Sequence, residues 1–125
     1  MTESHEWSQG EGRTKVTFSV CYLGNDPVIF IYNNNAHVGA VAVAEFDPDS
    51  GRTSTSLITR RGHKDDVVAQ KVAYMLTRST KRPSCVIAGI HVDAINEAEI
   101  KEILTNVDAL SNECIKREHK NEKRT

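Results

Sequence analysis

The amino-acid sequence predicts one α+β domain, an antiparallel meander followed by a helix, a strand and a second helix in the order ββββαβα. Three observations predict this order. The first half of the chain alternates apolar and polar residues with the two-residue period of strands. The second half changes to helical spacing, and one short, continuous apolar run interrupts it. The length of 125 residues allows a single domain with its own core.

Four short strands are expected in the first half, each followed by turn residues. The first covers 13–23, where Val16, Phe18, Val20 and Tyr22 share one side, and it ends at a Gly-Asn-Asp-Pro turn. The second covers 28–32 and ends at three asparagines, residues 33–35. The third and fourth cover 37–46 and 53–60, separated by an Asp-Pro-Asp-Ser-Gly turn. Short strands joined by tight turns indicate an antiparallel meander.

The second half is expected to form a helix over 64–78, a strand over 85–90 and a helix after Asn96. A helical stripe of Val68, Val72, Met75 and Leu76 supports the first helix. The apolar run Cys-Val-Ile-Ala-Gly-Ile at 85–90 is typical of a strand covered on both faces. Asn96 and Glu99 have the spacing of a capping box at the start of the last helix.

The third strand is apolar at both odd and even positions, at Val38, Ala40, Val41, Ala42 and Val43. Two helices cover one face of a sheet well, so the other face of this strand needs a second cover. We expect a homodimer to supply it. The N-terminal segment around Trp7 is the alternative cover.

Charge and composition set the domain limits and exclude some classes of function. We expect residues 1–12 to be a flexible acidic extension, 13–115 to be the α+β domain and 116–125 to be a charged tail. A net charge of −1 argues against nucleic acid as a partner. No apolar run is long enough to span a membrane, and the N-terminus lacks the plan of a signal peptide. Three cysteines in apolar surroundings indicate reduced thiols in a cytoplasmic protein.

Polar residues interrupt apolar or tightly turned chain in three segments. The first contains His37, which on its own is more typical of a structural histidine. The third contains His91 and Asp93, which project to one side of an extended chain and fit either a divalent metal or proton transfer. The alternative is a histidine that only bonds an aspartate capping the next turn. Walker, GxGxxG, HExxH and CxxC motifs are absent from the sequence.

The second segment leads into the first expected helix and suits a phosphate. Its residues are Arg60, Arg61, Gly62, His63, Lys64, Asp65 and Asp66. The start of a helix offers unpaired N–H groups and the positive end of the helix dipole, and the basic residues add charge. The two aspartates would repel an anion unless a cation lay between them and it. The alternative is that they only stabilise the start of the helix.

These three segments, in this order, resemble those of one small family, the LpdD-like proteins, over residues 15–110. The segments are Ala-His-Val-Gly-Ala-Val at 36–41, Gly-His-Lys-Asp-Asp at 62–66 and Ala-Gly-Ile-His-Val-Asp at 88–93. Its members are regarded as prenylated-flavin chaperones and as the D subunits of gallate and hydroxybenzoate decarboxylases. The resemblance implies a dimer with a fold similar to proteasome-assembly chaperones. It also implies an accessory protein that binds prenylated FMN for a UbiD-type decarboxylase and has no activity of its own.

The resemblance also implies a ligand site on matching residues. It would place the flavin at His37, His63 and His91, with Arg60, Arg61, Gly62 and Lys64 near the phosphate. A divalent metal held by His63, His91, Asp93 and Asp66 would bridge to that phosphate. The asparagines at 33–35 depart from the glycine-rich turn expected there. Two alternatives stay open, a small metal-dependent hydrolase or lyase and a purely structural subunit or assembly chaperone.

Overall fold

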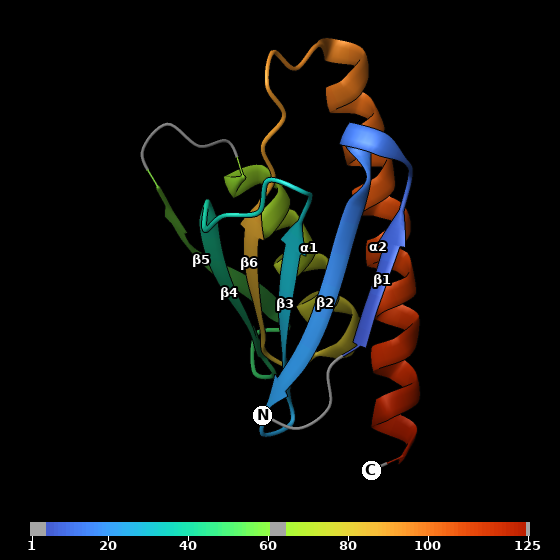
Figure 1. Cartoon of the computed structure of the whole chain (residues 1–125). Helices are drawn as coiled ribbons and strands as arrows, with labels where there is room; N and C mark the ends of the chain where they lie inside the picture. Colours follow the sequence, from blue (N-terminus) through green and yellow to red (C-terminus); the bar gives the residue numbers. More distant parts are fainter. Residues whose placement is uncertain (1–4, 61–64, 125) are drawn as a thin grey trace.

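A computed structural model describes residues 5–60 and 65–124 as one six-stranded sheet with two helices packed on it (Figure 1). The α+β class is therefore confirmed. The strands are β1 (His5–Gln9), β2 (Val16–Leu23), β3 (Asp26–Tyr32), β4 (Ala40–Asp47), β5 (Arg52–Thr59) and β6 (Ser84–Gly89). The helices are α1 (Asp66–Thr80) and α2 (Glu97–Arg124), and a short 3-10 helix spans Gly12–Thr14. No helix in the described ranges is long and apolar enough to cross a membrane.

The order of strands across the sheet is β1-β2-β3-β6-β4-β5, so the expected continuous meander is wrong in one respect. The last strand in the sequence, β6, lies between β3 and β4, parallel to β3 and antiparallel to β4. Its apolar residues alternate between buried and half-buried positions, which suits a central strand with neighbours on both sides. The crossover through α1 brings the chain from the edge strand β5 back to this position.

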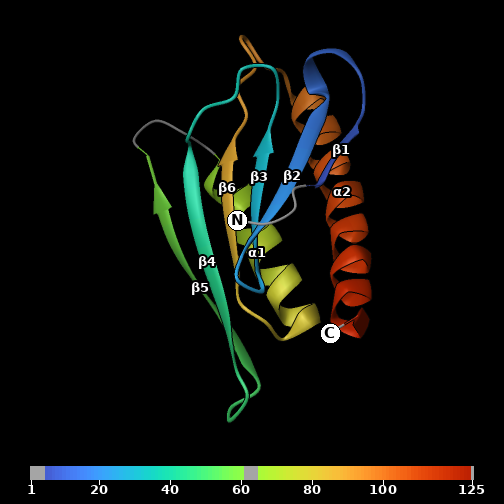
Figure 2. The ribbon, with the colours of Figure 1, turned by 60° about the horizontal axis from the view of Figure 1, so that its bottom comes forward.

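The core lies between one face of the sheet and the two helices, which lie on the same side in both views (Figures 1 and 2). Alternate side chains of the strands supply the sheet half of the core: Val16, Phe18, Val20, Ile29, Ile31, Ala40, Ala42, Ala44, Val86 and Ala88. Val72 and Leu76 of α1 and Val107 and Leu110 of α2 supply much of the rest. The opposite face has no helix over it in the described chain, and Val43 and Ile58 are 49% and 74% exposed there.

Both ends of the chain differ from the expected solvated extensions. His5–Gln9 forms the edge strand β1, which pairs with β2 and places Trp7 6.1 Å from Phe18, ring centre to ring centre. Residues 116–124 continue α2 as helix, and the Arg117 guanidinium lies 4.4 Å from the centre of the Trp7 ring. Burial of Trp7 against Phe18 holds the N-terminal strand in place, and the strand in turn supports the end of α2. Trp7 thus faces the helices and leaves the other face of β4 open.

Candidate functional site

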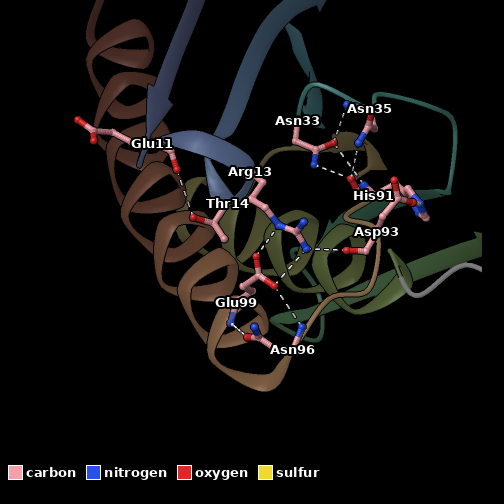
Figure 3. Close-up of polar contacts among 9 residues, drawn as sticks. All are labelled: Glu11, Arg13, Thr14, Asn33, Asn35, His91, Asp93, Asn96 and Glu99. Atoms are coloured by element: carbon pink, nitrogen blue, oxygen red, sulfur yellow. Dashed lines mark hydrogen bonds and ion pairs between the residues drawn. The ribbon is translucent and has the colours of Figure 1, made fainter.

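Described residues of all three polar segments meet at one end of the sheet. Because β3 and β6 run parallel, their carboxyl ends lie at the same edge, and β4 begins there. The loop 33–39 after β3 and the loop 90–93 after β6 therefore lie side by side, as Figure 3 shows. The rings of His37 and His91 are 6.4 Å apart and meet edge to face. Arg61, Gly62, His63 and Lys64 lie outside the described residues.

His37 lies between a carbonyl and a carboxylate. Its Nδ1 donates to the backbone oxygen of Asn35 at 3.1 Å, and its Nε2 lies 3.2 Å from Oδ2 of Asp65. Asp65 is only 5% exposed, and its other carboxylate oxygen accepts the backbone N–H of Ile90 at 2.9 Å. Both oxygens of this buried carboxylate thus have a partner. The pair fixes His37 beside the ends of β4 and β6.

Two glycines make this close approach possible. A Cβ on Gly39 would lie 1.9 Å from Oδ2 of Asp65, and one on Gly89 would lie 1.5 Å from the backbone oxygen of His37. Any side chain at either position would therefore push away the carboxylate or the loop that carries His37. The Gly39 N–H also donates to the backbone oxygen of Ala88 at 2.9 Å, which holds the start of β4 against β6.

Asparagine side chains hold the loop after β6 (Figure 3). The backbone oxygen of His91 accepts from the amide groups of Asn33 at 2.8 Å and Asn35 at 3.1 Å. The backbone N–H of His91 donates to Oδ1 of Asn33 at 3.3 Å. Sequence reasoning took these asparagines only as turn residues and missed this role. Amide side chains can both donate to and accept from backbone groups, so three successive asparagines could have indicated bonds to a neighbouring loop.

His91 and Asp93 interact, but both remain on the surface. Nε2 of His91 lies 2.8 Å from Oδ1 of Asp93, and their side chains are 56% and 87% exposed. His91 and Asp93 lie in the loop that follows β6. The strand β6 itself ends at Gly89, one residue earlier than expected. Asp65 reaches the cluster at His37, whereas Asp66 is the first residue of α1. No group of three or more His, Cys, Asp or Glu side chains suited to a metal occurs within 5–60 and 65–124.

Arg60 lies at the border of the site and bonds the loop that carries His37. Its backbone N–H donates to the oxygen of Gly39 at 2.9 Å, and its guanidinium donates to the oxygen of Val38 at 2.8 Å. The arginine therefore joins the end of β5 to the start of β4. The guanidinium has further N–H groups beyond the one it gives to Val38.

A hollow of about 500 Å³ opens beside His37 on the uncovered face of the sheet. It is lined by Ser19, Phe30, Ile31, Tyr32, Ala36, His37, Val38 and Ile87. Phe30 and Ile87 lie directly opposite each other in the parallel pair of β3 and β6. Burial raises the pKa of Tyr32, as does the hydrogen bond that its hydroxyl donates to Glu6 at 3.1 Å. Sequence reasoning missed this hollow, although the strands that form it carry apolar residues on both faces.

One family model matches most of the chain. A family model described as "prenylated flavin chaperone LpdD-like domain" matches residues 10–119. The chain belongs to this family. The LpdD-like match includes the loops with His37 and His91, the carboxylate of Asp65 and every strand that lines the hollow.

The fold of this LpdD-like chain is similar to that of a solved chaperone complex for yeast 20S proteasome assembly. The TM-score is 0.55 at 12% sequence identity, and the similarity covers 90% of this chain and 93% of the other. At this identity the likeness concerns the fold alone, and it confirms the expected architecture. No protein among the curated sequences compared with it matches.

Proposed function

We propose that this chain binds prenylated FMN in the hollow beside His37 and delivers it to, or matures it for, a UbiD-type aromatic acid decarboxylase. The chain itself is an accessory protein, and the decarboxylase carries the activity. One observation carries the proposal. In a member of a prenylated flavin chaperone family, an open apolar hollow with an aromatic wall lies next to a fixed polar cluster.

The described part of the site fits the ring system of a prenylated flavin. A volume of about 500 Å³ lies in the range of small-molecule sites. Phe30, Ile87 and Val38 offer apolar surface to the flat rings and to the added prenyl carbons. The His37 imidazole, fixed by Asp65, offers a polar group at the edge of that surface. Hydrogen bonds from a rigid frame of this kind orient a ligand whose flat rings lie on apolar surface.

We predict that the segment 60–64 contacts the phosphate of the cofactor. Arg60 is fixed at the border of the hollow by its bond to Val38, which also lines the hollow. Arg61, Gly62, His63 and Lys64 follow it directly in the sequence and precede α1. The ring of His91 lies 6.4 Å from that of His37, and His91 is the last residue of the predicted cofactor set. The metal bridge depends on His63 and likewise stays a prediction.

We also propose that two copies of the chain associate through the uncovered face of the sheet. Val38, Val43 and Ile58 are 53%, 49% and 74% exposed, and Val43 and Ile58 lie on this face while Val38 borders the hollow. Burying such side chains removes apolar surface from water, which stabilises a dimer. A second copy across this face would also close the hollow from solvent.

Cofactor binding is tested by co-expression with a flavin prenyltransferase. The purified chain is expected to carry a visible flavin spectrum and, by mass spectrometry, prenylated FMN. His37→Ala and Val38→Asp are expected to lose the cofactor and keep their fold by circular dichroism. The matched controls are His119→Ala on α2 and Leu23→Asp at the far end of β2, and both are expected to keep it. A colourless wild type would overturn the proposal, and colour retained in Val38→Asp would overturn the placement in the hollow.

Delivery is tested separately with the loaded chain. Mixing it with a purified apo-decarboxylase of the UbiD type is expected to produce decarboxylation of an aromatic acid, and the unloaded chain is expected to produce none. Free prenylated FMN at the same concentration is the control. If the loaded chain activated the decarboxylase no more than free prenylated FMN does, the delivery role would be refuted and the chain would only bind the cofactor.

A further inference from the structure

The strand β5 forms one edge of the sheet and pairs with β4 alone among the described elements (Figures 1 and 2). Its sequence is Arg-Thr-Ser-Thr-Ser-Leu-Ile-Thr, rich in β-branched residues. It lacks the prolines, lysines and inward-pointing charges with which proteins usually block a free edge. The other edge strand, β1, has five residues, against eight in β5. β5 is therefore the longer and less protected edge.

The register of β4 and β5 shows which backbone groups of this edge lie free. The backbone N–H of Arg60 donates to Gly39, opposite it in the register that pairs Val41 with Ile58. Because hydrogen-bonded pairs alternate in an antiparallel ladder, the even-numbered residues of β5 bond to β4. The odd-numbered residues then direct their N–H and C=O groups outward: Thr53, Thr55, Leu57 and Thr59.

A groove runs beside this edge on the side of α1. A cavity of about 340 Å³ is lined by Thr55 of β5 and by Val67, Gln70, Lys71 and Tyr74 of α1. The four helix residues have the i, i+3, i+4, i+7 spacing of a single helix face. Val67 and Tyr74 are 59% and 39% exposed although they are apolar and aromatic. A strand laid along β5 would place alternate side chains over these two residues.

We propose that β5 and this groove bind an extended segment of a partner protein, which adds to the sheet as a further strand. The free backbone groups of the edge require an extended partner, and the groove favours an apolar side chain at alternate positions. Arg52 begins β5, Arg60 follows its end, and the strand contains no acidic residue. A segment with an acidic residue near each end therefore fits best.

A second copy of this chain fits the same edge less well. Antiparallel self-pairing of β5 has two central registers that join its outward-facing groups. With Thr55 on the two-fold axis, Arg52 of one copy lies opposite Ile58 of the other and diagonally beside its Arg60. With Ser56 on the two-fold axis, the outward-facing Thr55 lies opposite Leu57. That register also places Arg52 of one copy opposite Arg60 of the other, at both ends. Like charges directly opposite each other destabilise a strand pair. The proposed binding site is the edge of the sheet at β5, whereas the dimer is proposed through the uncovered face. The inference about the edge does not rest on cofactor binding.

Amide hydrogen exchange of the full chain, measured by NMR, tests the proposal. The probe is a short capped peptide of alternating valine and threonine with an aspartate at each end. It is expected to slow exchange at Thr53, Thr55, Leu57 and Thr59 at least tenfold. The same peptide with alternate backbone nitrogens methylated is the control, and it is expected to slow none of them.

Unchanged exchange at all the odd-numbered amides with saturating peptide would overturn the proposal. Slowing that appears without peptide and increases with protein concentration would overturn it in favour of a second copy. Shifts confined to the residues of the hollow would also overturn it, since the peptide would then bind the uncovered face.

Substitutions separate the edge from the groove. Thr55→Pro removes an outward N–H but no bond to β4, and it is expected to raise the Kd of the peptide about tenfold or more. Thr55→Val keeps the N–H and is expected to leave binding near that of the wild type. Tyr74→Lys, on the exposed face of α1, tests the groove without altering the strand and is expected to weaken binding severalfold. If Thr55→Pro and Tyr74→Lys both bound the peptide as tightly as the wild type, the assignment of the peptide to this edge and groove would be refuted.

Discussion

Gly89→Ala gives the sharpest test of how the site is built. An added Cβ would lie 1.5 Å from the backbone oxygen of His37 and 2.5 Å from its carbonyl carbon. Real Cβ contacts essentially never fall below 3.0 Å, so the loop oxygen must retreat from 1.5 Å to at least 3.0 Å from the new Cβ. The obstacle is backbone, which cannot rotate away as the end of a flexible side chain can.

A retreat of this size breaks the bonds that hold the loop to β6. The Gly39 N–H bond to Ala88 is 2.9 Å long, the Asn35 bond to His91 is 3.1 Å, and the His37–Asp65 contact is 3.2 Å. At about 1 kcal/mol for each of these contacts, the variant loses about 2 to 3 kcal/mol of unfolding free energy. For a domain of this length that corresponds to a fall in Tm of roughly 10 °C.

Thermal unfolding followed by circular dichroism, with prenylated-FMN content in parallel, measures both effects. Gly24→Ala is the matched control because nothing lies within 4 Å of its Cβ, and its φ of +64° makes alanine strained. It is expected to lose about 1 to 2 kcal/mol and to keep its cofactor. Gly89→Ala is expected to lose the cofactor as well as stability. A Gly89→Ala variant as stable as the wild type would refute this account of the loop.

Two further predictions concern titration. The hydrogen bond from Arg13 holds the pKa of Glu99 below its ordinary value of 4.5, helped by the Asn96 N–H. The stability that this bond contributes is present above pH 4.5 and is lost as the pH falls below it. The difference in unfolding free energy between wild type and Glu99→Gln should therefore shrink in acid. A difference that stays constant with pH would contradict this. Burial, with the nearby Glu118 charge, raises the pKa of Cys114 from 9.0 to about 12. Native Cys114 should therefore resist iodoacetamide at mildly alkaline pH in peptide mass spectrometry, and labelling as fast as in the unfolded chain would contradict this.

Local patterns in the sequence predicted most of the elements. The alternation of Val16, Phe18 and Val20 appears as the buried side of β2. The capping box forms as expected, with the Glu99 N–H donating to Oδ1 of Asn96 at 2.8 Å. These signals are reliable because the groups involved lie within a few residues of each other along the chain. The strand β1 was missed because its burial depends on Trp7 meeting Phe18 and Arg117, which no local pattern contains.

For the candidate site, the sequence identified the loops but not their internal contacts. His37 and His91 were singled out as polar residues beside strands, and their convergence required β6 to lie between β3 and β4. The choice of Asp65 over Asp66 depended on where α1 begins and on the space left by Gly39. Neither fact can be read from spacing along the chain.

The sequence by itself determined the α+β class, the order of the elements from β2 to α2 and the polar segments, because each follows from hydrophobic period, turn chemistry and capping within short stretches. Only the tertiary structure decided three further features. These are the place of β6, the hollow bounded by Phe30 and Ile87, and the free edge of β5 with its groove against α1. The physical reason is that each arises from the pairing of strands distant in sequence. That pairing depends on the total burial of the sheet, which no single segment encodes.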